Sequence, residues 1–102
     1  MAKKHSVTLL NAAAAVVNGT GVAVENYRDF TVFIEASGGA NATVQIQAKA
    51  PSGNWIAIDS RAIAADGNTV VQFAGALKEI RAAITARTAG TFTVTMDAMK
   101  EA

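Results

Sequence analysis

The stretch ATVQIQAKAPSGNWIAIDS, residues 42–60, decides the fold because it has the pattern of a β-hairpin near the middle of the chain. Val44, Ile46 and Ala48 alternate with polar residues, and this period of two places one face of a strand in a core and the other in water. The segment PSGN at 51–54 follows, where proline presets one backbone dihedral and glycine accepts a positive φ. The pattern therefore predicts two strands joined by a tight turn.

The alternation resumes beyond the turn and divides the second strand into two faces. Ile56 and Ile58 are expected on the inner face, with Trp55, Ala57 and Asp59 on the outer one. Trp55 then has two interpretations. Its ring either covers the hairpin as a partly buried side chain, or serves as a contact aromatic at a subunit interface or against a sugar.

Runs of alternating residues on both sides of the hairpin predict further short strands. These cover residues 5–10, 22–24, 30–35, 69–74, 77–87 and 91–98. Glycine-containing segments at 37–41, 66–68 and 89–90 are expected to be turns, the first and last of them hairpin turns. Seven or eight short strands with mostly hairpin connections predict an all-β fold, an antiparallel, jelly-roll-like β-sandwich.

Two segments leave the choice between helix and strand open. Residues 12–17 combine four alanines, which favour helix, with two valines, which favour strand, and strand is slightly preferred. The run ALKEIRAAITAR at 76–87 has good helix formers and no helix breaker. Its alternation is cleaner than its helical stripe, so we expect a strand there.

Composition limits the class of protein. The 102 residues predict a single domain, in which residues 1–6 form a short flexible N-terminal arm. A net charge of +1 with 17% charged residues argues against both disorder and a nucleic-acid partner. The absence of cysteine excludes disulfides and zinc–thiolate sites and is typical of a reducing cytoplasm. No apolar run approaches the roughly 20 residues of a membrane span, so no membrane partner is expected.

Candidate catalytic residues are scarce. His5 is the only histidine and lies beside a terminus, where a held imidazole is not expected. The eight acidic residues show no calcium-loop spacing, and no lysine with serine or threonine follows the glycine pairs as in a phosphate loop. We therefore expect neither an enzyme nor a cofactor or metal site.

The small side chains favour burial between subunits. Alanine occurs 23 times and threonine ten times, so each core residue buries little apolar area. A thin core of this kind is marginal alone, and a homo-oligomer, a dimer or trimer, would supplement it. Arg81 and Arg87 lie on the polar face of their expected strand, where they would pair with acids of neighbouring strands or with another subunit.

Five segments together resemble the small virion proteins of tailed bacteriophages. They are GTGV at 19–22, DFTVFIEASG at 29–38, ATVQIQAKAPSGNWIAI at 42–58, DGNTVVQFAGALKEIRAAI at 66–84 and GTFTVTM at 90–96. The resemblance covers most of the chain and includes a tryptophan-bearing hairpin, an "iR"-containing strand and a threonine-rich last strand. It implies a structural protein and supplies no catalytic residue.

The resemblance implies a capsid decoration, or cement, protein on the virion surface, synthesised in the host cytoplasm. Its partner would be the major capsid protein or another virion protein. Lys3, Lys4 and His5 of the arm would reach a neighbour in the shell. The alternative is a glycan- or receptor-binding module, for example of a phage tail, in which Trp55 and Tyr27 would form the contact patch.

Overall fold

The computed structural model describes the backbone of residues 3–100 and the side chains of residues 5–99, and the regular structure in this range is entirely β-strand. Its strands are β1 (Lys3–Ala13), β2 (Val17–Asn18), β3 (Val22–Ala23), β4 (Asp29–Lys49), β5 (Trp55–Ile63), β6 (Gly67–Ala74) and β7 (Glu79–Lys100).

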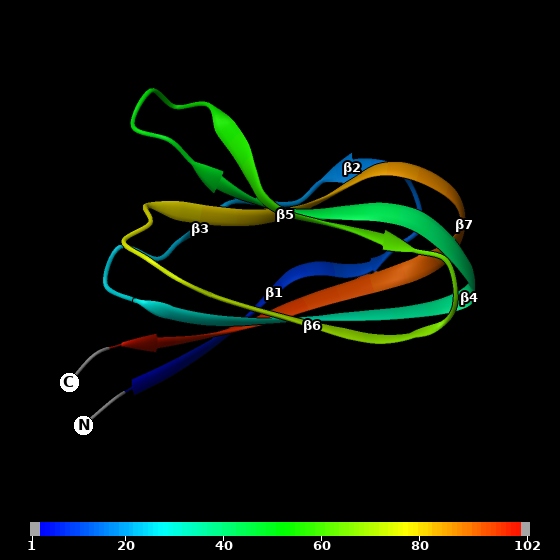
Figure 1. Cartoon of the computed structure of the whole chain (residues 1–102), viewed down its shortest axis with the longest axis horizontal. Helices are drawn as coiled ribbons and strands as arrows, with labels where there is room; N and C mark the ends of the chain where they lie inside the picture. The colour runs from blue at the N-terminus through cyan, green and yellow to red at the C-terminus, as the bar shows by residue number, and fades with distance from the viewer. Residues whose placement is uncertain (1–2, 101–102) are drawn as a thin grey trace.

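Two long strands, β4 and β7, organise the molecule. They pair antiparallel along almost their whole length, from Asp29 opposite Met99 to Ala48 opposite Ile80. Both strands curve over at the same end of the molecule (Figure 1). Each of them therefore begins in one layer and ends in the other.

Glycines allow the strands to turn this corner. Gly38 and Gly39 in β4 have φ values of 79° and 74°, and Gly90 in β7 has a φ of 104°. Side chains with a Cβ rarely adopt these dihedrals. The β4–β7 register is interrupted between Ser37 and Asn41 and then continues, so the chain bends without reversing.

The hairpin turns predicted at 37–41 and 89–90 are therefore wrong. The pattern correctly indicated residues with positive φ, but the same dihedrals make a corner as readily as a reversal. Because both strands pass through these segments, they are much longer than the short strands expected. β4 contains 21 residues and β7 contains 22.

The corner creates two layers with the same strand order. One layer contains β1, the second half of β7, the first half of β4 and then β6. The other contains β2 and β3, the first half of β7, the second half of β4 and then β5. All pairs are antiparallel, which confirms the predicted all-β antiparallel sandwich. Figure 1 shows the layers one above the other, with the corner at the right.

The core lies between the layers and follows the predicted alternation. In β7, Phe92, Val94 and Met96 are fully buried, while the threonines between them are partly exposed. β4 contributes Phe30 and Ile34 in the same way. The strand period of two is thus confirmed on both long strands.

The segments left open between helix and strand are now resolved. β7 begins at Glu79, which confirms strand rather than helix over 79–87. In the 12–17 segment, β1 ends at Ala13 and β2 begins at Val17, with a short connection between them.

The free arm predicted at residues 1–6 is wrong for residues 3–6. These residues form the start of β1, with Lys3 opposite Lys100 and Ser6 opposite Asp97. A hydrogen bond of 2.6 Å from Ser6 Oγ to Asp97 Oδ1 adds to the backbone pairing. The prediction failed because the pairing partner is at the other end of the chain. Residues 1–2 lie outside the described range.

Two side chains hold the corner. The backbone N–H of Ala40 donates to Asp66 Oδ1 over 2.8 Å, so the β5–β6 turn fastens the bend of β4. Arg87 Nε donates to the carbonyl oxygen of Gly90 over 2.9 Å and fastens the bend of β7. Buried backbone groups freed from the ladder need such partners.

Candidate contact surface

The β4–β5 hairpin is formed as predicted and projects at the end of the sandwich opposite the corner (Figure 1). Lys49 pairs with Trp55, and the backbone N–H of Ala50 donates to the carbonyl oxygen of Asn54 over 2.8 Å. Gly53 occupies the turn with a φ of 95°. The proline and glycine of this segment therefore form the tight turn that their local dihedral preferences predict.

A β-bulge changes the faces of β5. The register shifts between Ile46, which faces Asp59, and Gln47, which faces Ala57, so Ile58 is the extra residue. Residues directly opposite each other in an antiparallel pair share a face, and Ile46 is fully buried. Asp59 therefore lies on the inner face, and its predicted outer position is wrong because alternation fails at a bulge.

The inner face of β5 is not covered near the hairpin. Ile56 is opposite the buried Ala48, yet 56% of it is exposed, and Ile58 is 42% exposed. β5 is the last strand of its layer, and its hairpin end projects from the sandwich, so these side chains are not enclosed. The expected burial of Ile56 and Ile58 is therefore wrong, although Ile56 has the predicted face.

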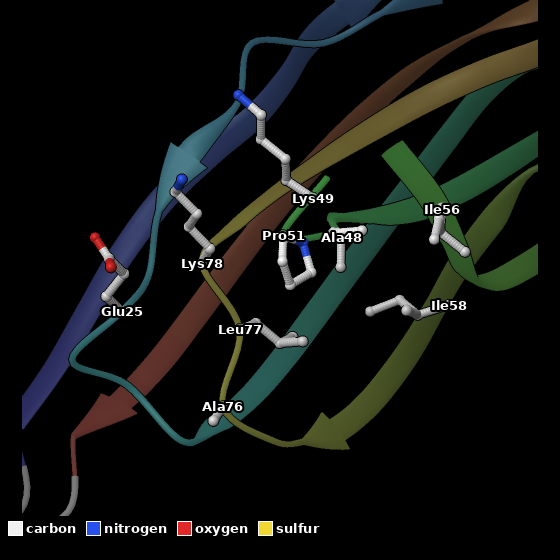
Figure 2. Close-up of a pocket in the computed structure, with 10 residues that line it drawn as sticks. Glu25, Ala48, Lys49, Pro51, Ile56, Ile58, Ala76, Leu77 and Lys78 are labelled. Carbon is white, nitrogen blue, oxygen red and sulfur yellow. The ribbon is translucent and has the colours of Figure 1, made fainter. Parts of the chain in front are cut away.

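The two isoleucines line a groove of about 550 Å³ between the hairpin and the β6–β7 connection (Figure 2). Its apolar walls include Pro51 of the turn and Leu77 of the connection. The lining residues are Glu25, Ala48, Lys49, Ala50, Pro51, Ile56, Ile58, Ala76, Leu77 and Lys78. The groove is apolar along its floor and charged at its rim, a combination typical of binding surfaces.

The charged rim is only partly neutralised within the chain. Lys49 Nζ lies 3.4 Å from Glu79 Oε2. Glu25 and Lys78 form no ion pair with another described residue. Figure 2 shows both side chains at the edge of the groove, where they are available to a partner.

Trp55 lies on the opposite face of the hairpin and is half-buried. Arg81 Cζ lies 4.5 Å from its ring centroid, and Lys49 Nζ lies 5.8 Å from it. A Cβ on Gly21 would come within 2.9 Å of the ring, so glycine is needed for this close approach. The ring covers the hairpin and is packed between cations and the β2–β3 connection.

Arg81 extends this cluster into the sheet. Its Nε donates to Oε1 of the buried Gln47 over 2.7 Å, and Gln47 Nε2 donates to Gln45 Oε1 over 3.0 Å. The expected pairing of Arg81 with an acid is wrong, because the neighbour on its face is a glutamine. Arg87 likewise contacts the Gly90 carbonyl rather than an acid.

Replacing Arg81 by alanine is expected to lower the free energy of unfolding by about 1–3 kcal/mol, since the buried amide oxygen of Gln47 loses its charged donor. Urea unfolding followed by circular dichroism measures this change. The emission of Trp55, the only tryptophan, should also shift. The exposed Arg28 provides the control, and its alanine variant should stay within about 0.5 kcal/mol of the parent. Equal losses in the two variants would contradict this role.

The structure does not gather the predicted contact residues into one site. The His5 and Tyr27 rings stack with centroids 5.5 Å apart, close to the chain start. Lys3 and Lys4 precede them in β1. Trp55 and Arg81 form the cluster described above, and Arg87 is at the corner, at the far end of the molecule.

The sequence pattern does not indicate that the groove residues form a surface. Ile56 and Ile58 have the alternation of core residues, and the pattern predicts Leu77 within a strand. Their exposure is visible only in the tertiary structure, where β5 lies at the end of its layer and its hairpin projects. The bulge at Ile58 changes the faces of β5. The sequence of β5 alone does not show it, because a bulge is defined by the pairing with the partner strand.

The described residues contain no group of three or more His, Cys, Asp or Glu side chains arranged to hold a metal ion. In the same part of the chain, no helix is long and apolar enough to cross a membrane.

Comparison with known proteins shows the fold class. No family model matches the chain, and no curated protein matches it in sequence. Solved structures do match, and they include phage-derived and viral proteins as well as a subunit of Bacillus endospore pili.

One similar structure is the SPBc2 prophage-derived protein YomS, with a TM-score of 0.79, 21% identity, and coverage of 98% of this chain and 96% of YomS. Another is the PBSX exported protein XepA, with a TM-score of 0.72 and 20% identity. The match covers 97% of this chain but 38% of XepA, so this chain spans well under half of that protein. VP2 of the infectious bursal disease virus subviral particle matches with a TM-score of 0.55 and 9% identity, over 98% of this chain and 33% of VP2.

Proposed function

We propose that this chain is a structural protein of a phage virion and that it decorates the outer surface of the head as a cement protein. The observation that carries the proposal is the apolar groove, in which Ile56 and Ile58 are 56% and 42% exposed. The fold shared with the prophage-derived YomS supports the phage origin. The fold shared with VP2 of a viral subviral particle supports a structural role.

The groove is suited to a partner that forms an assembled lattice with many identical binding sites. Fully burying an isoleucine contributes about 1.5–3 kcal/mol relative to leaving it exposed. Two such residues give modest affinity at one site, but a capsid offers many identical sites. A protein that binds only the assembled lattice stabilises it by mass action. The major capsid protein is therefore the partner that we propose.

Other predicted contacts lie at the same end of the molecule. The start of β1, the end of β7, the β3–β4 loop and the β4–β5 hairpin are all opposite the corner (Figure 1). We include Lys3, Lys4 and His5 as additional contacts at the edge of the bound surface. In this arrangement the corner of the sandwich points away from the surface of the head.

The glycan-binding alternative is less well supported. A sugar stacks on a free aromatic face, whereas Arg81 already lies 4.5 Å from the centroid of Trp55. Tyr27 is likewise stacked on His5. A saturable change of tryptophan emission on titration with host glycans would favour this alternative.

Replacing Ile56 by lysine should reduce the affinity for heads at least about tenfold, because roughly 1.4 kcal/mol or more of apolar contact is lost. The measurement is co-sedimentation with heads of the phage whose genome encodes the chain. Folding should be unchanged by circular dichroism, since Ile56 is more than half exposed.

The matched control is Val16→Lys. Val16 is 61% exposed and lies between β1 and β2, near the corner, away from the groove. This variant should pellet with heads like the parent. If the parent protein does not pellet with heads, the cement role is refuted. If the Ile56→Lys variant pellets as well as the parent, the groove is not the contact.

A further inference from the structure

The free edges of the sandwich differ in how they are protected against pairing with another chain. β5 carries the bulge at Ile58, and its residues Asp59 and Arg61 face inward, opposite the buried Ile46 and Val44. Their side chains form a bidentate ion pair, in which the N–O distances are 3.0 and 3.1 Å. Bulges and inward-pointing charges are devices that block edge-to-edge pairing.

The edge strands beside β7 are protected as well. β1 has two register shifts, between Thr8 and Leu10 and between Leu10 and Ala13, and it begins with two lysines. β2 and β3 contain two residues each. Irregular, lysine-bearing or very short edge strands are poor templates for a further strand.

β6 lacks each of these devices. It pairs with β4 over eight consecutive positions without a register shift, and among the described residues β4 is its only partner. Its sequence, GNTVVQFA at 67–74, contains no charged residue and no proline. Val70 is 52% exposed on its outer face. A regular, uncharged, β-branched edge is the kind that recruits another strand.

We propose that β6 is a subunit interface at which a second copy of this chain pairs through its own β6, antiparallel across a twofold axis. The faces of β6 limit the possible registers. Val71 is buried and Phe73 half-buried on the inner face, whereas Val70 and Gln72 are exposed on the outer face. Opposite residues must share a face, which allows the registers centred on any one residue of β6, and we propose the one centred on Val71, the buried residue near the middle of the strand. Val71 then pairs with Val71 of the partner subunit, and Val70 pairs with Gln72 of the partner subunit.

A second copy is the occupant that this edge fits. In a twofold contact every residue meets a residue of the same strand, and an uncharged strand brings no like charges together. A different protein would normally be selected by complementary charge, which β6 does not offer. The contact extends one layer continuously across both subunits and supplements the alanine-rich core. It uses residues other than those of the groove, so it is independent of head binding.

Two double variants test the interface and its register. Val70→Lys with Gln72→Lys places lysines opposite lysines across the axis and should weaken the dimer at least about tenfold. Val70→Lys with Gln72→Glu places each lysine opposite a glutamate and should keep the dimer. Both remove the same valine and differ only in the charge at position 72. Sedimentation velocity over a dilution series of the full chain measures the oligomer, and circular dichroism verifies folding.

The proposal requires a dimeric parent, a dissociated lysine–lysine variant and a dimeric lysine–glutamate variant. A parent that is monomeric at all concentrations would overturn it. A lysine–lysine variant that keeps the parent's oligomer would show that β6 is not the interface. Equal dissociation of the two variants would overturn the register.

Discussion

Replacing Gly90 by alanine is expected to lower the free energy of unfolding by about 3 kcal/mol or more, through backbone strain and steric overlap together. Gly90 has a φ of 104°, which residues with a Cβ rarely adopt. A Cβ at this position would lie 2.6 Å from Cα of Ala40 and 3.1 Å from the carbonyl oxygen of Ser37. Both atoms belong to the backbone of β4, so relief requires the two long strands to separate at their corner.

The control for this prediction is Gly39→Ala on the other strand of the corner. Gly39 has a φ of 74°, but no atom lies within 4 Å of the position of its missing Cβ. We expect it to lose only the strain, about 1–2 kcal/mol. Urea and thermal unfolding measure both variants, and 1 kcal/mol corresponds to a shift in Tm of about 4–8 °C in a domain of this size. Similar losses in the two variants would show that the close approach at Gly90 does not matter.

Replacing Phe92 by alanine should cost about 3–5 kcal/mol, which is the range for truncating a buried phenylalanine. Phe92 is fully buried just beyond the corner of β7. Its cross-strand neighbours are Ala36 on β4 and Ala13 on β1. Because both are alanines, neither can swing into the cavity, and the cost should lie in the upper part of this range. The free energy from urea denaturation tests it directly.

Phe33→Ala is the matched comparison, since Phe33 is a half-buried phenylalanine on the outer face of β4. Its truncation leaves no closed cavity and should cost about 1–2 kcal/mol. A loss as large as that of the Phe92 variant would mean that the outer face of this layer is covered by another surface.

Much of the fold was predictable because it is encoded locally. The alternation TFTVTM identified Phe92, Val94 and Met96 as core residues, and all three are fully buried. The β4–β5 turn was also recognised, because its proline and glycine act on their own dihedrals. These features depend on residues within a few positions of each other.

The candidate surface was less predictable. Trp55 was identified as a ring covering the hairpin or as a contact residue, and the structure places Arg81 against it. The groove was missed, because Ile56 and Ile58 have the same local pattern as true core residues. Exposure depends on what the opposite layer covers, and that layer is formed by strands distant in sequence.

The sequence by itself determined that the chain is all-β, which residues alternate inward on its long strands, and where glycines give the backbone positive φ. Only the tertiary structure decided that two of those glycine segments are corners, that β1 pairs with the end of β7, and that β6 is left as an unprotected edge. The reason is physical: a residue's own dihedrals and polarity are local properties. Continuation of a strand, coverage of a face and protection of an edge depend instead on which distant strand pairs with it.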